Sequence, residues 1–275
     1  MKILVTGANG YLGVGIVKSM LDLGHQVIAT DLSLERVDNR ASKIESDIFE
    51  IEDPFSFFGM PECLVHLAWR DGFKHFSYAH ICDLSKHTSF IEKMCVSGLK
   101  TIAVMGTMHE IGFFEGSIDE TTPCNPLNYY GISKNALREI TRIICEKNGV
   151  EYIWLRAFYI VDNSPKGNSI FSKIVQAVNK GERSFPFTTG QNQYDFLDYN
   201  EFSRRVALTV SQNKITGIIN ICSGFPEKLS HRVQRFINDN HYSITLDYGA
   251  FPDRAYDSKA IWGNSQKIEM ILRNE

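Results

Sequence analysis

The chain has 275 residues, of which 43% are hydrophobic, and its formal net charge is −3 at pH 7. This apolar content is enough for one large core, or for one core with a small second lobe. Lysine and arginine are scattered along the chain, whereas nucleic-acid and membrane-surface binders carry a concentrated basic face. No run approaches the ~20 apolar residues that span a bilayer. We therefore expect neither a nucleic-acid nor a membrane partner.

The start of the chain and its cysteines indicate the cellular compartment in which the protein is expected. The apolar run Ile3–Val5 is too short for the core of a signal peptide, and a glycine-rich turn follows it directly. The six cysteines form no C-x-x-C pair, and several lie in apolar segments, where a free cysteine behaves as a small hydrophobe. The expectation is a cytoplasmic protein with reduced thiols.

Short β-branched runs alternate with longer helical patterns over the first two-thirds of the chain, which is typical of βαβ units and a parallel sheet. Apolar strands are expected at Lys2–Thr6, Gln26–Thr30, Cys63–Leu67, Thr101–Met105 and Tyr152–Arg156. Helices are expected at Tyr11–Leu23, Tyr78–Cys95 and Asn128–Lys147. The pattern predicts an α/β fold with a Rossmann-type doubly wound parallel sheet.

After about Val161 the alternation stops, and short segments rich in proline and aromatic residues follow, such as Ser184–Phe187. One more apolar strand is expected at Gly217–Ile221, and a last helix from about Asn264. We predict a Rossmann domain over residues 1–161 and a smaller C-terminal lobe built mainly from residues 162–275. The strand within residues 215–222 is expected to return to the main sheet.

The strongest local motif is the turn Thr6–Gly13, which follows an expected strand and opens an expected helix. Gly7 permits a tight turn, Gly10 lets backbone approach a pyrophosphate, and Gly13 lets the helix pack against the strand. The N-terminus of that helix offers free N–H groups and a partial positive charge to phosphates. The motif predicts that the Rossmann domain binds a dinucleotide, and the smaller lobe is expected to bind the substrate.

The next strand ends near Asp31, about where an acidic residue binds both ribose hydroxyls of a dinucleotide. An acid there repels a 2′-phosphate and favours NAD. Arg36 follows closely in the sequence, and arginine is the usual partner of a 2′-phosphate. NAD is therefore the expected cofactor, and NADP stays open.

Tyr130 and Lys134 are four residues apart at the start of an expected helix, so both project from one face. An ammonium near the tyrosine favours phenolate, which lowers the pKa of Tyr130 and makes it an acid–base group. A hydroxyl is expected at the end of the strand Thr101–Met105, where such sheets place their ligands. Thr107 occupies that position. These three residues are the predicted catalytic set, in which Lys134 also holds the nicotinamide ribose.

The order and spacing of the motifs resemble the extended (atypical) short-chain dehydrogenase/reductases, the NAD-dependent epimerase/dehydratase family that acts on nucleotide sugars. The resemblance covers nearly the whole chain and is carried by Thr6–Gly13, Ser46–Ile48, Leu64–Ala68, Thr107–Gly112, Tyr130, Lys134, Arg156, Gln193–Asn200, Ile219–Gly224, Arg254–Asp257 and Trp262–Ile268. It implies cofactor contacts from Gly7, Gly10, Tyr11, Leu12, Gly13, Asp31, Asp47, Ile48, Leu67, Ala68, Tyr130 and Lys134. It implies substrate contacts from Met108, His109, Tyr159 and Arg254, and a homodimer.

Departures from the family pattern reduce the number of reactions that this chain is expected to catalyse. Family dehydratases carry an acidic pair directly after the active-site threonine, where this chain has Met108 and His109. The reductive 3,5-epimerases carry a cysteine after the active-site hydroxyls, and this chain has none there. Both activities are disfavoured. Tyr194 and Tyr159 replace an arginine and an asparagine of the family's substrate site, which leaves Arg254 as the expected diphosphate partner.

The predicted reaction is NAD(P)-dependent reduction of a 4-keto sugar attached to a nucleotide. In this prediction Tyr130 moves the proton, Lys134 lowers its pKa and orients the ribose, and Thr107 polarises the carbonyl. A nucleotide-sugar 4-epimerase with retained NAD uses the same residues and stays open. A non-catalytic dinucleotide-binding regulator is disfavoured because all three catalytic residues are present.

His80, Asp83 and His87 share one face of the helical pattern Tyr78–Cys95. The histidines and cysteines of the chain match no recognised zinc spacing. We predict no metal site and expect these three residues on a solvated helix face.

Overall fold

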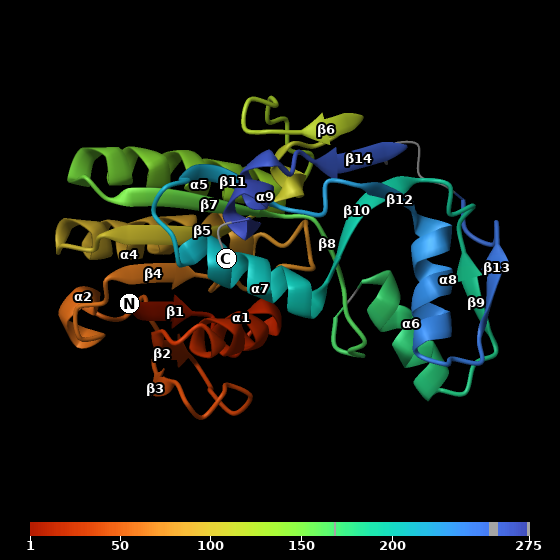
Figure 1. Ribbon diagram of the computed structural model, residues 1–275, viewed down its shortest axis with the longest axis horizontal. Helices are drawn as coiled ribbons and strands as arrows, with labels where there is room; N and C mark the ends of the chain where they lie inside the picture. Colours follow the sequence, from red (N-terminus) through yellow and green to blue (C-terminus); the bar gives the residue numbers. More distant parts are fainter. Residues whose placement is uncertain (168, 253–257, 274–275) are drawn as a thin grey trace.

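Seven parallel strands form the main sheet of the computed structural model, which describes residues 1–167, 169–252 and 258–273 (Figure 1). Their order is β11, β7, β5, β4, β1, β2, β3, so the direction of strand addition reverses beside β1. Sheets of this kind bind ligands at the carboxyl ends of the strands next to that reversal. The predicted Rossmann-type sheet is confirmed. The bounds are β1 (Lys2–Thr6), β2 (Gln26–Asp31), β3 (Ser42–Glu45), β4 (Cys63–His66), β5 (Thr101–Thr107), β7 (Glu151–Ala157) and β11 (Gly217–Ile221).

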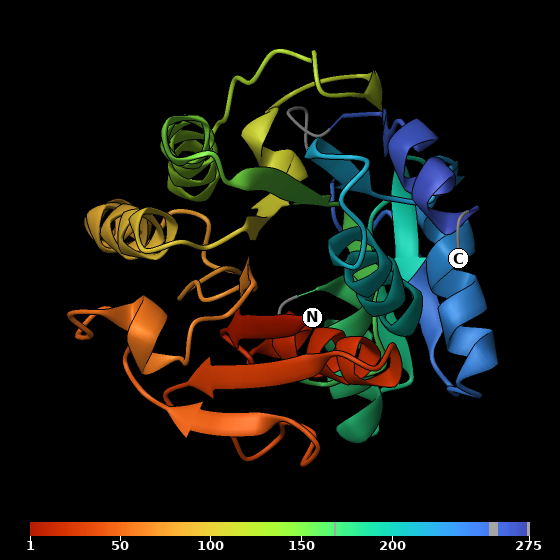
Figure 2. The same ribbon diagram turned by 60° about the vertical axis from the view of Figure 1, so that its left-hand side comes forward.

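Helices cover both faces of this sheet (Figure 2). Side chains alternate along each strand, so Ile3 and Val5 join the core beneath α1 and α7, and Leu4 joins the core beneath α4 and α5. Burial on both faces explains why the strands are apolar throughout. Among the described residues, no helix combines the length and apolar character needed to cross a membrane. The bounds are α1 (Tyr11–Asp22), α2 (Pro54–Phe57), α3 (Ala79–Cys82), α4 (Leu84–Val96), α5 (Tyr129–Asn148), α7 (Tyr199–Val210) and α9 (Gln266–Leu272).

The expected helix Tyr78–Cys95 is two helices, because α3 ends and α4 begins at Asp83. The prediction of a solvated face is wrong. His80, Asp83 and His87 are each less than a tenth exposed, since the face that they share is turned inward. Asp83 receives two hydrogen bonds from the guanidinium of Arg70, which pairs the acid with a cation.

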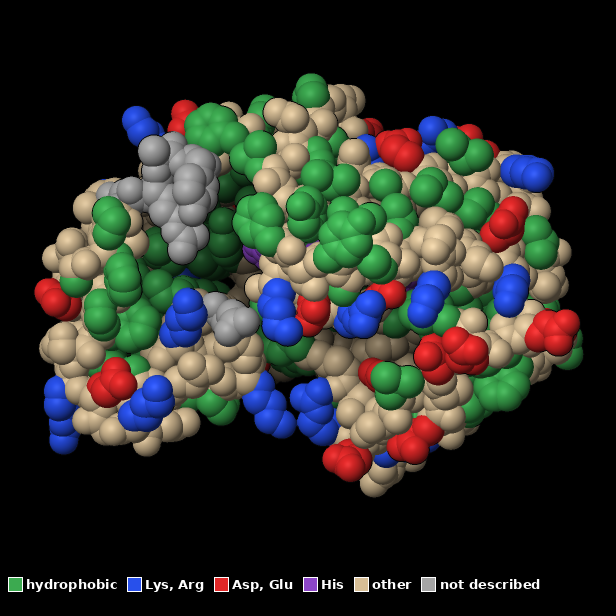
Figure 3. Space-filling view, turned by 180° about the vertical axis from the view of Figure 1, so that it is seen from behind, with side chains coloured by type: hydrophobic (Ala, Val, Ile, Leu, Met, Phe, Trp, Pro, Cys, Tyr) green, Lys and Arg blue, Asp and Glu red, His purple; other side chains and the backbone are tan. Residues whose placement is uncertain are grey.

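A second sheet lies beyond the carboxyl ends of β5 and β7, with strand order β12, β10, β14, β6 and with β8 paired to β10 (Figure 1). Strands β9 and β13 form a separate parallel pair, next to α6 and α8. The surface is hollowed where this part meets the main domain (Figure 3). The bounds are β6 (Gly116–Ile118), β8 (Tyr159–Val161), β9 (Ser184–Phe187), β10 (Gln193–Asp198), β12 (Pro226–Lys228), β13 (Thr245–Tyr248), β14 (Ala260–Gly263), α6 (Ile170–Asn179) and α8 (Leu229–Asp239).

The chain after residue 161 contributes to both parts of the molecule. β11 pairs with β7 at the edge of the main sheet, α7 packs against α1, and α9 packs against α7 and β11. The helices α6 and α8 lie in the outer part (Figure 1). A boundary near residue 161 therefore separates the chain only approximately, and the assignment of residues 162–275 as mainly a substrate-binding lobe stays a prediction.

Candidate active site

The glycine turn joins β1 to α1 and is closely packed. Gly7 has a φ of +66°, and a Cβ on it would lie 2.6 Å from the backbone nitrogen of Ala68. A Cβ on Gly13 would lie 2.2 Å from the carbonyl oxygen of Gly7. Only glycine fits these two positions. Helix α1 then begins at Tyr11 with its cap residue Gly10 in an extended conformation, so free N–H groups of the first turn suit a pyrophosphate.

Asp31 lies at the end of β2, beside this turn. Its carboxylate accepts hydrogen bonds from the backbone N–H groups of Asn9, at 3.0 Å, and Leu32, at 2.8 Å. Arg36 also contacts Asn9, because its backbone N–H donates to the Asn9 side chain and its guanidinium donates to the Asn9 carbonyl. An acid and an arginine therefore flank the expected position of the adenosine ribose.

The remaining predicted cofactor residues line the same edge of the sheet. Ala68 packs against Gly7, and Leu67 donates its backbone N–H to the carbonyl of Thr6 at 3.2 Å. Ile48 is 6% exposed, while the carboxylate of Asp47 accepts the N–H of Phe49 at 3.0 Å. The residues present thus fit a dinucleotide along β1, β2 and β4.

Tyr199, at the start of α7, was not singled out from the sequence. Its hydroxyl accepts the backbone N–H of Gly15 at 2.9 Å and donates to the carbonyl of Tyr11 at 2.6 Å. A Cβ on Gly15 would lie 2.5 Å from the hydroxyl of Ser203. The C-terminal part of the chain therefore fixes the first turn of α1, a contact across more than 180 residues that no local pattern reveals.

The predicted catalytic residues meet at the carboxyl end of β5. Thr107 ends that strand and caps the short helix η1 (Met108–Glu110). Tyr130 and Lys134 lie one turn apart near the start of α5, and Thr107 is among the groups that influence the pKa of Tyr130. A Cβ on Gly131 would lie 2.4 Å from the carbonyl oxygen of His109, so this glycine lets α5 approach η1 closely.

The ionisation of Tyr130 differs from the expectation based on the sequence. Burial raises the pKa of Tyr130, and the side chain of Thr107 opposes that shift in part. Burial lowers the pKa of Lys134 to about 7. The ammonium of Lys134 donates to the carbonyl of Met105 at 2.9 Å and lies 3.9 Å from the ring centroid of Trp69. Tyr130 is therefore held in its protonated form in this structure, whereas a lowered pKa was expected.

Aromatic and imidazole rings surround Tyr130, and the sequence did not indicate this. His75 stacks on the Tyr130 ring at 5.4 Å between centroids, and its carbonyl accepts the Tyr130 N–H. Trp69 lies edge-on to Tyr130 and donates its indole N–H to His80 at 3.0 Å. Below them, His87 bonds to His66 at 2.9 Å. These rings enclose the Tyr130 side chain on several sides.

The predicted substrate residues are distributed unevenly. His109 is half-buried, 4.3 Å from His75 between ring centroids, whereas Met108 is 8% exposed and packs in the main core. Tyr159 contacts Tyr194 in the second sheet, with 4.5 Å between ring centroids and the rings tilted by 32°. Arg254 lies outside the described residues, so its predicted diphosphate contact stays a prediction.

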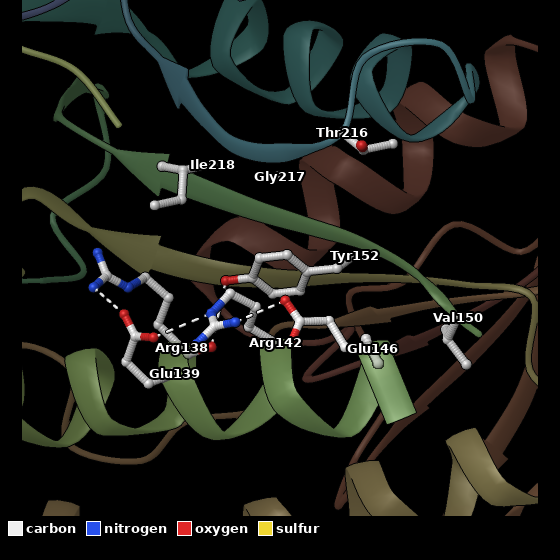
Figure 4. A pocket seen from close by; sticks show the side chains of 10 residues that line it. Arg138, Glu139, Arg142, Glu146, Val150, Tyr152, Thr216, Gly217 and Ile218 are labelled. Carbon is white, nitrogen blue, oxygen red and sulfur yellow. Dashed lines mark hydrogen bonds and ion pairs between the residues drawn. The ribbon is translucent and has the colours of Figure 1, made fainter. Parts of the chain in front are cut away.

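A cavity of about 320 Å³ lies elsewhere, between the C-terminal half of α5 and the first residues of β7 and β11 (Figure 4). Arg138, Glu139, Arg142 and Glu146 form ion pairs along its wall. It sits away from the carboxyl ends of the strands and does not belong to the active site. In the part of the chain that the structure describes, no three His, Cys, Asp or Glu side chains are placed to hold a metal ion.

Comparison with known proteins identifies the family. A family model described as the NAD dependent epimerase/dehydratase family matches residues 3–222. The chain is 41% identical to a dTDP-6-deoxy-L-talose 4-dehydrogenase (NAD(+)) of Aggregatibacter actinomycetemcomitans, over 96% of this chain and 99% of the relative. It is 28% identical to a UDP-glucose 4-epimerase of Lacticaseibacillus casei, over 99% of this chain and 91% of the relative.

Solved structures share the fold. A UDP-N-acetylglucosamine 4-epimerase from Methanobrevibacter ruminantium superposes with a TM-score of 0.84 at 18% identity, covering 98% of this chain and 91% of the other. The Thermus thermophilus UDP-glucose 4-epimerase in complex with NAD gives a TM-score of 0.83 at 18% identity, covering 98% and 92%. The predicted family and fold class are confirmed. The chain belongs to the NAD dependent epimerase/dehydratase family.

Proposed function

We propose that this protein reduces the C4 carbonyl of a 6-deoxyhexose linked to a nucleoside diphosphate, with NADH as the reductant. The observation that carries the proposal is the group at the end of β5, where Thr107 and Tyr130 come together and Lys134 lies one turn further along α5. A reduction needs a proton donor beside the carbonyl oxygen, and burial keeps Tyr130 protonated.

The residues of the chain have separate roles in this proposal. Thr107 donates a hydrogen bond to the O4 oxygen and polarises the carbonyl, and Tyr130 delivers the proton to that oxygen. Lys134 orients the nicotinamide ribose and steadies the charge that is left on Tyr130. NADH supplies the hydride when it is bound. The glycine turn at Gly7 and Gly13 accepts the pyrophosphate of the cofactor.

The relatives support reduction over epimerisation. The relative that is 41% identical is named a 4-dehydrogenase acting on a dTDP-linked 6-deoxy-L-talose, and reduction of the 4-keto sugar is the reverse of such a reaction. The UDP-glucose 4-epimerase of Lacticaseibacillus casei is 28% identical. The favoured substrate is accordingly a dTDP-linked 4-keto-6-deoxyhexose, and a 4-epimerase with retained NAD is the second candidate.

We also propose a cytoplasmic homodimer. Helices α4 and α5 pack side by side, and α5 exposes Ile132 at 46%, Ile140 at 37% and Ile143 at 54%. Three exposed isoleucines on one helix are suited to burial against a second copy. All six cysteines are free, which supports a reducing compartment. Ile143→Glu should then shift the mass measured by light scattering from dimer to monomer, and an unchanged mass would reject α5 as the interface.

The proposal is tested with purified protein, NADH or NADPH, and a panel of dTDP- and UDP-linked 4-keto-6-deoxyhexoses. We expect a stoichiometric loss of nicotinamide absorbance with a dTDP-linked sugar, and a rate about 10³-fold lower with Tyr130→Phe. The same nucleotides carrying 4-hydroxyhexoses test the alternative, and inversion at C4 of such a sugar without net oxidation or reduction of added cofactor would favour the epimerase. NADH binding without turnover of any sugar would favour a regulator.

A further inference from the structure

Glu110 is a carboxylate buried beneath the catalytic residues, and the proposed reaction assigns it no role. It closes η1 and is fully buried. One of its oxygens accepts the backbone N–H of Thr107 at 2.7 Å. The indole N–H of Trp154 lies 2.9 Å from that oxygen and 3.1 Å from the other. The side chain is thus held by the catalytic threonine and by the neighbouring strand β7.

Two guanidinium groups complete the surroundings of Glu110. Arg156 lies 3.5 Å from its second oxygen and Arg138 lies 3.9 Å from it. Every polar contact of the carboxyl group is with a donor, and a protonated carboxyl would need an acceptor. Burial raises the pKa of Glu110, and the two guanidinium groups and the donated N–H groups oppose that shift. The donor set indicates the ionised form.

The neighbouring glycine is suited to this arrangement. A Cβ on Gly106 would lie 2.0 Å from the indole nitrogen of Trp154 and 2.7 Å from an oxygen of Glu110. Gly106 directly precedes Thr107 in β5. The strand end therefore leaves room for Glu110 and Trp154 to meet directly behind the catalytic threonine.

The charge of Glu110 reaches the catalytic pair. It raises the pKa of Lys134 and that of Tyr130, because a nearby negative charge stabilises an ammonium and disfavours a phenolate. The titratable and charged groups that face it come from α5 and β7: Tyr130, Lys134, Arg138, Tyr152 and Arg156.

We infer that Glu110 is a positioning residue, which fixes Thr107 through its backbone N–H and supplies the permanent negative charge beneath Tyr130 and Lys134. This inference rests on the proposed function. The effect of the Glu110 charge can be separated from the effect of its packing. Glu110→Gln removes the charge and keeps the shape of the side chain, whereas Glu110→Asp keeps the charge and shortens the side chain.

The decisive variant is Glu110→Gln, which keeps the shape of the side chain and removes its charge. Loss of the charge lowers the pKa of Lys134 and of Tyr130, so both groups lose their proton at lower pH. We expect the basic limb of the kcat profile for reduction to move down by about 1 pH unit. Glu146→Gln, which removes a 63% exposed carboxylate that pairs with Arg142 on the same helix, is the matched control and should leave the limb in place.

Glu110→Asp separates charge from geometry. The shorter side chain keeps the charge but loses reach to the Thr107 N–H, so we expect a wild-type limb and a kcat about tenfold lower. A uniform fall in rate in Glu110→Gln without movement of the limb would overturn the inference. If the glutamine variant does not fold, the aspartate variant decides, and an unchanged kcat in it would also overturn the inference.

A binding measurement separates this inference from the proposed function. NADH binding is followed against pH by nicotinamide fluorescence, since Lys134 is the proposed ribose contact. If no sugar is reduced by the wild type, the proposed function fails, and a lower-pH loss of NADH binding in Glu110→Gln still supports the role of Glu110. An active wild type with unmoved limbs in both assays would reject the role of Glu110 alone.

Discussion

The glycine turn and the Tyr130 group lie at the same end of the main sheet but are built in different ways. The turn depends on backbone: at Gly7 and Gly13 a single Cβ would overlap main-chain atoms. The Tyr130 group depends on buried side chains, in which Glu110 and several rings hold Thr107 and Tyr130. The comparison teaches that cofactor binding here is a matter of steric fit, whereas the proposed proton transfer is a matter of burial and charge. Each prediction below disturbs one side of the comparison and leaves the other intact.

The largest effect is expected for Tyr130→Phe. Loss of the proton donor should lower kcat for reduction by about 10³-fold, while NADH binding stays within about twofold because the turn is untouched. The measurement is steady-state oxidation of NADH together with fluorescence titration. The neighbouring Tyr129, which is 39% exposed, gives the control Tyr129→Phe, for which near-normal kcat is expected. Equal losses in the two variants would contradict the assignment of Tyr130.

Gly7→Ala tests the turn. The added methyl would overlap the backbone of Ala68, and relief of that overlap displaces the phosphate-binding N–H groups. NADH binding should weaken by about 100-fold, which isothermal titration measures.

Gly149→Ala is the matched control for Gly7→Ala, since Gly149 also has a φ of +66° but has no atom within 4 Å of an added Cβ. This variant should lose about 1–2 kcal/mol of folding stability through backbone strain and keep the wild-type Kd for NADH. If both variants bound NADH equally well, the close approach at Gly7 would not matter for the cofactor.

Acid should destabilise the folded protein through its buried histidines. Burial lowers the pKa of His66 to about 3, so below the ordinary value of about 6.5 the unfolded chain takes up a proton that the folded chain excludes. The free energy of unfolding should fall by about 1.4 kcal/mol per pH unit for this group as the pH drops from about 6.5. Urea titrations between pH 7 and pH 5 measure the slope.

His66→Gln should reduce that slope, and the exposed His231→Gln should not. A slope that is the same in the wild type and in His66→Gln would mean that the histidine is not held neutral. NADH binding at pH 7 should be retained in His231→Gln, because His231 lies in α8 and not in the glycine turn.

The smallest effect is expected for Arg36→Ala. The guanidinium contacts the carbonyl of Asn9 beside Asp31, at the edge of the site where a 2′-phosphate would lie. NADPH binding should weaken by about fivefold, as for an exposed charge, and NADH binding should not change. Equal weakening of both cofactors would place Arg36 in the support of the turn rather than in the discrimination of a phosphate.

The parts of the fold with local signals could be predicted from the sequence. Every strand expected in the main sheet is present within a residue or two of its predicted bounds, since fully buried parallel strands are continuous apolar runs. The break at Asp83 was missed because α3 and α4 follow each other with a single residue between them. The packing of α7 on α1 was missed because it joins segments distant in sequence.

The same limit applies to the candidate site. The turn and the Tyr130–Lys134 pair were found because fixed spacings report helix geometry and tight turns. Glu110 and His87 read as ordinary polar residues of a loop and a helix, since their burial depends on partners in other elements, such as Trp154 and His66. The direction of the pKa shift of Tyr130 was missed for the same reason. The sequence shows that Lys134 is near Tyr130, but it does not show that Tyr130 is buried by other elements.

The most direct test of the proposed reaction uses NADH that carries deuterium at the transferable position of the nicotinamide, with both stereochemical forms assayed. The wild-type protein is incubated with a dTDP-linked 4-keto-6-deoxyhexose, and the product is analysed by proton NMR. We predict that only one of the two deuterated forms of NADH transfers its label. With that form, the product carries one deuterium at C4 for each NADH oxidised. Recovery of the unreduced ketone, with no deuterium at C4 from either form of the cofactor, would contradict the account.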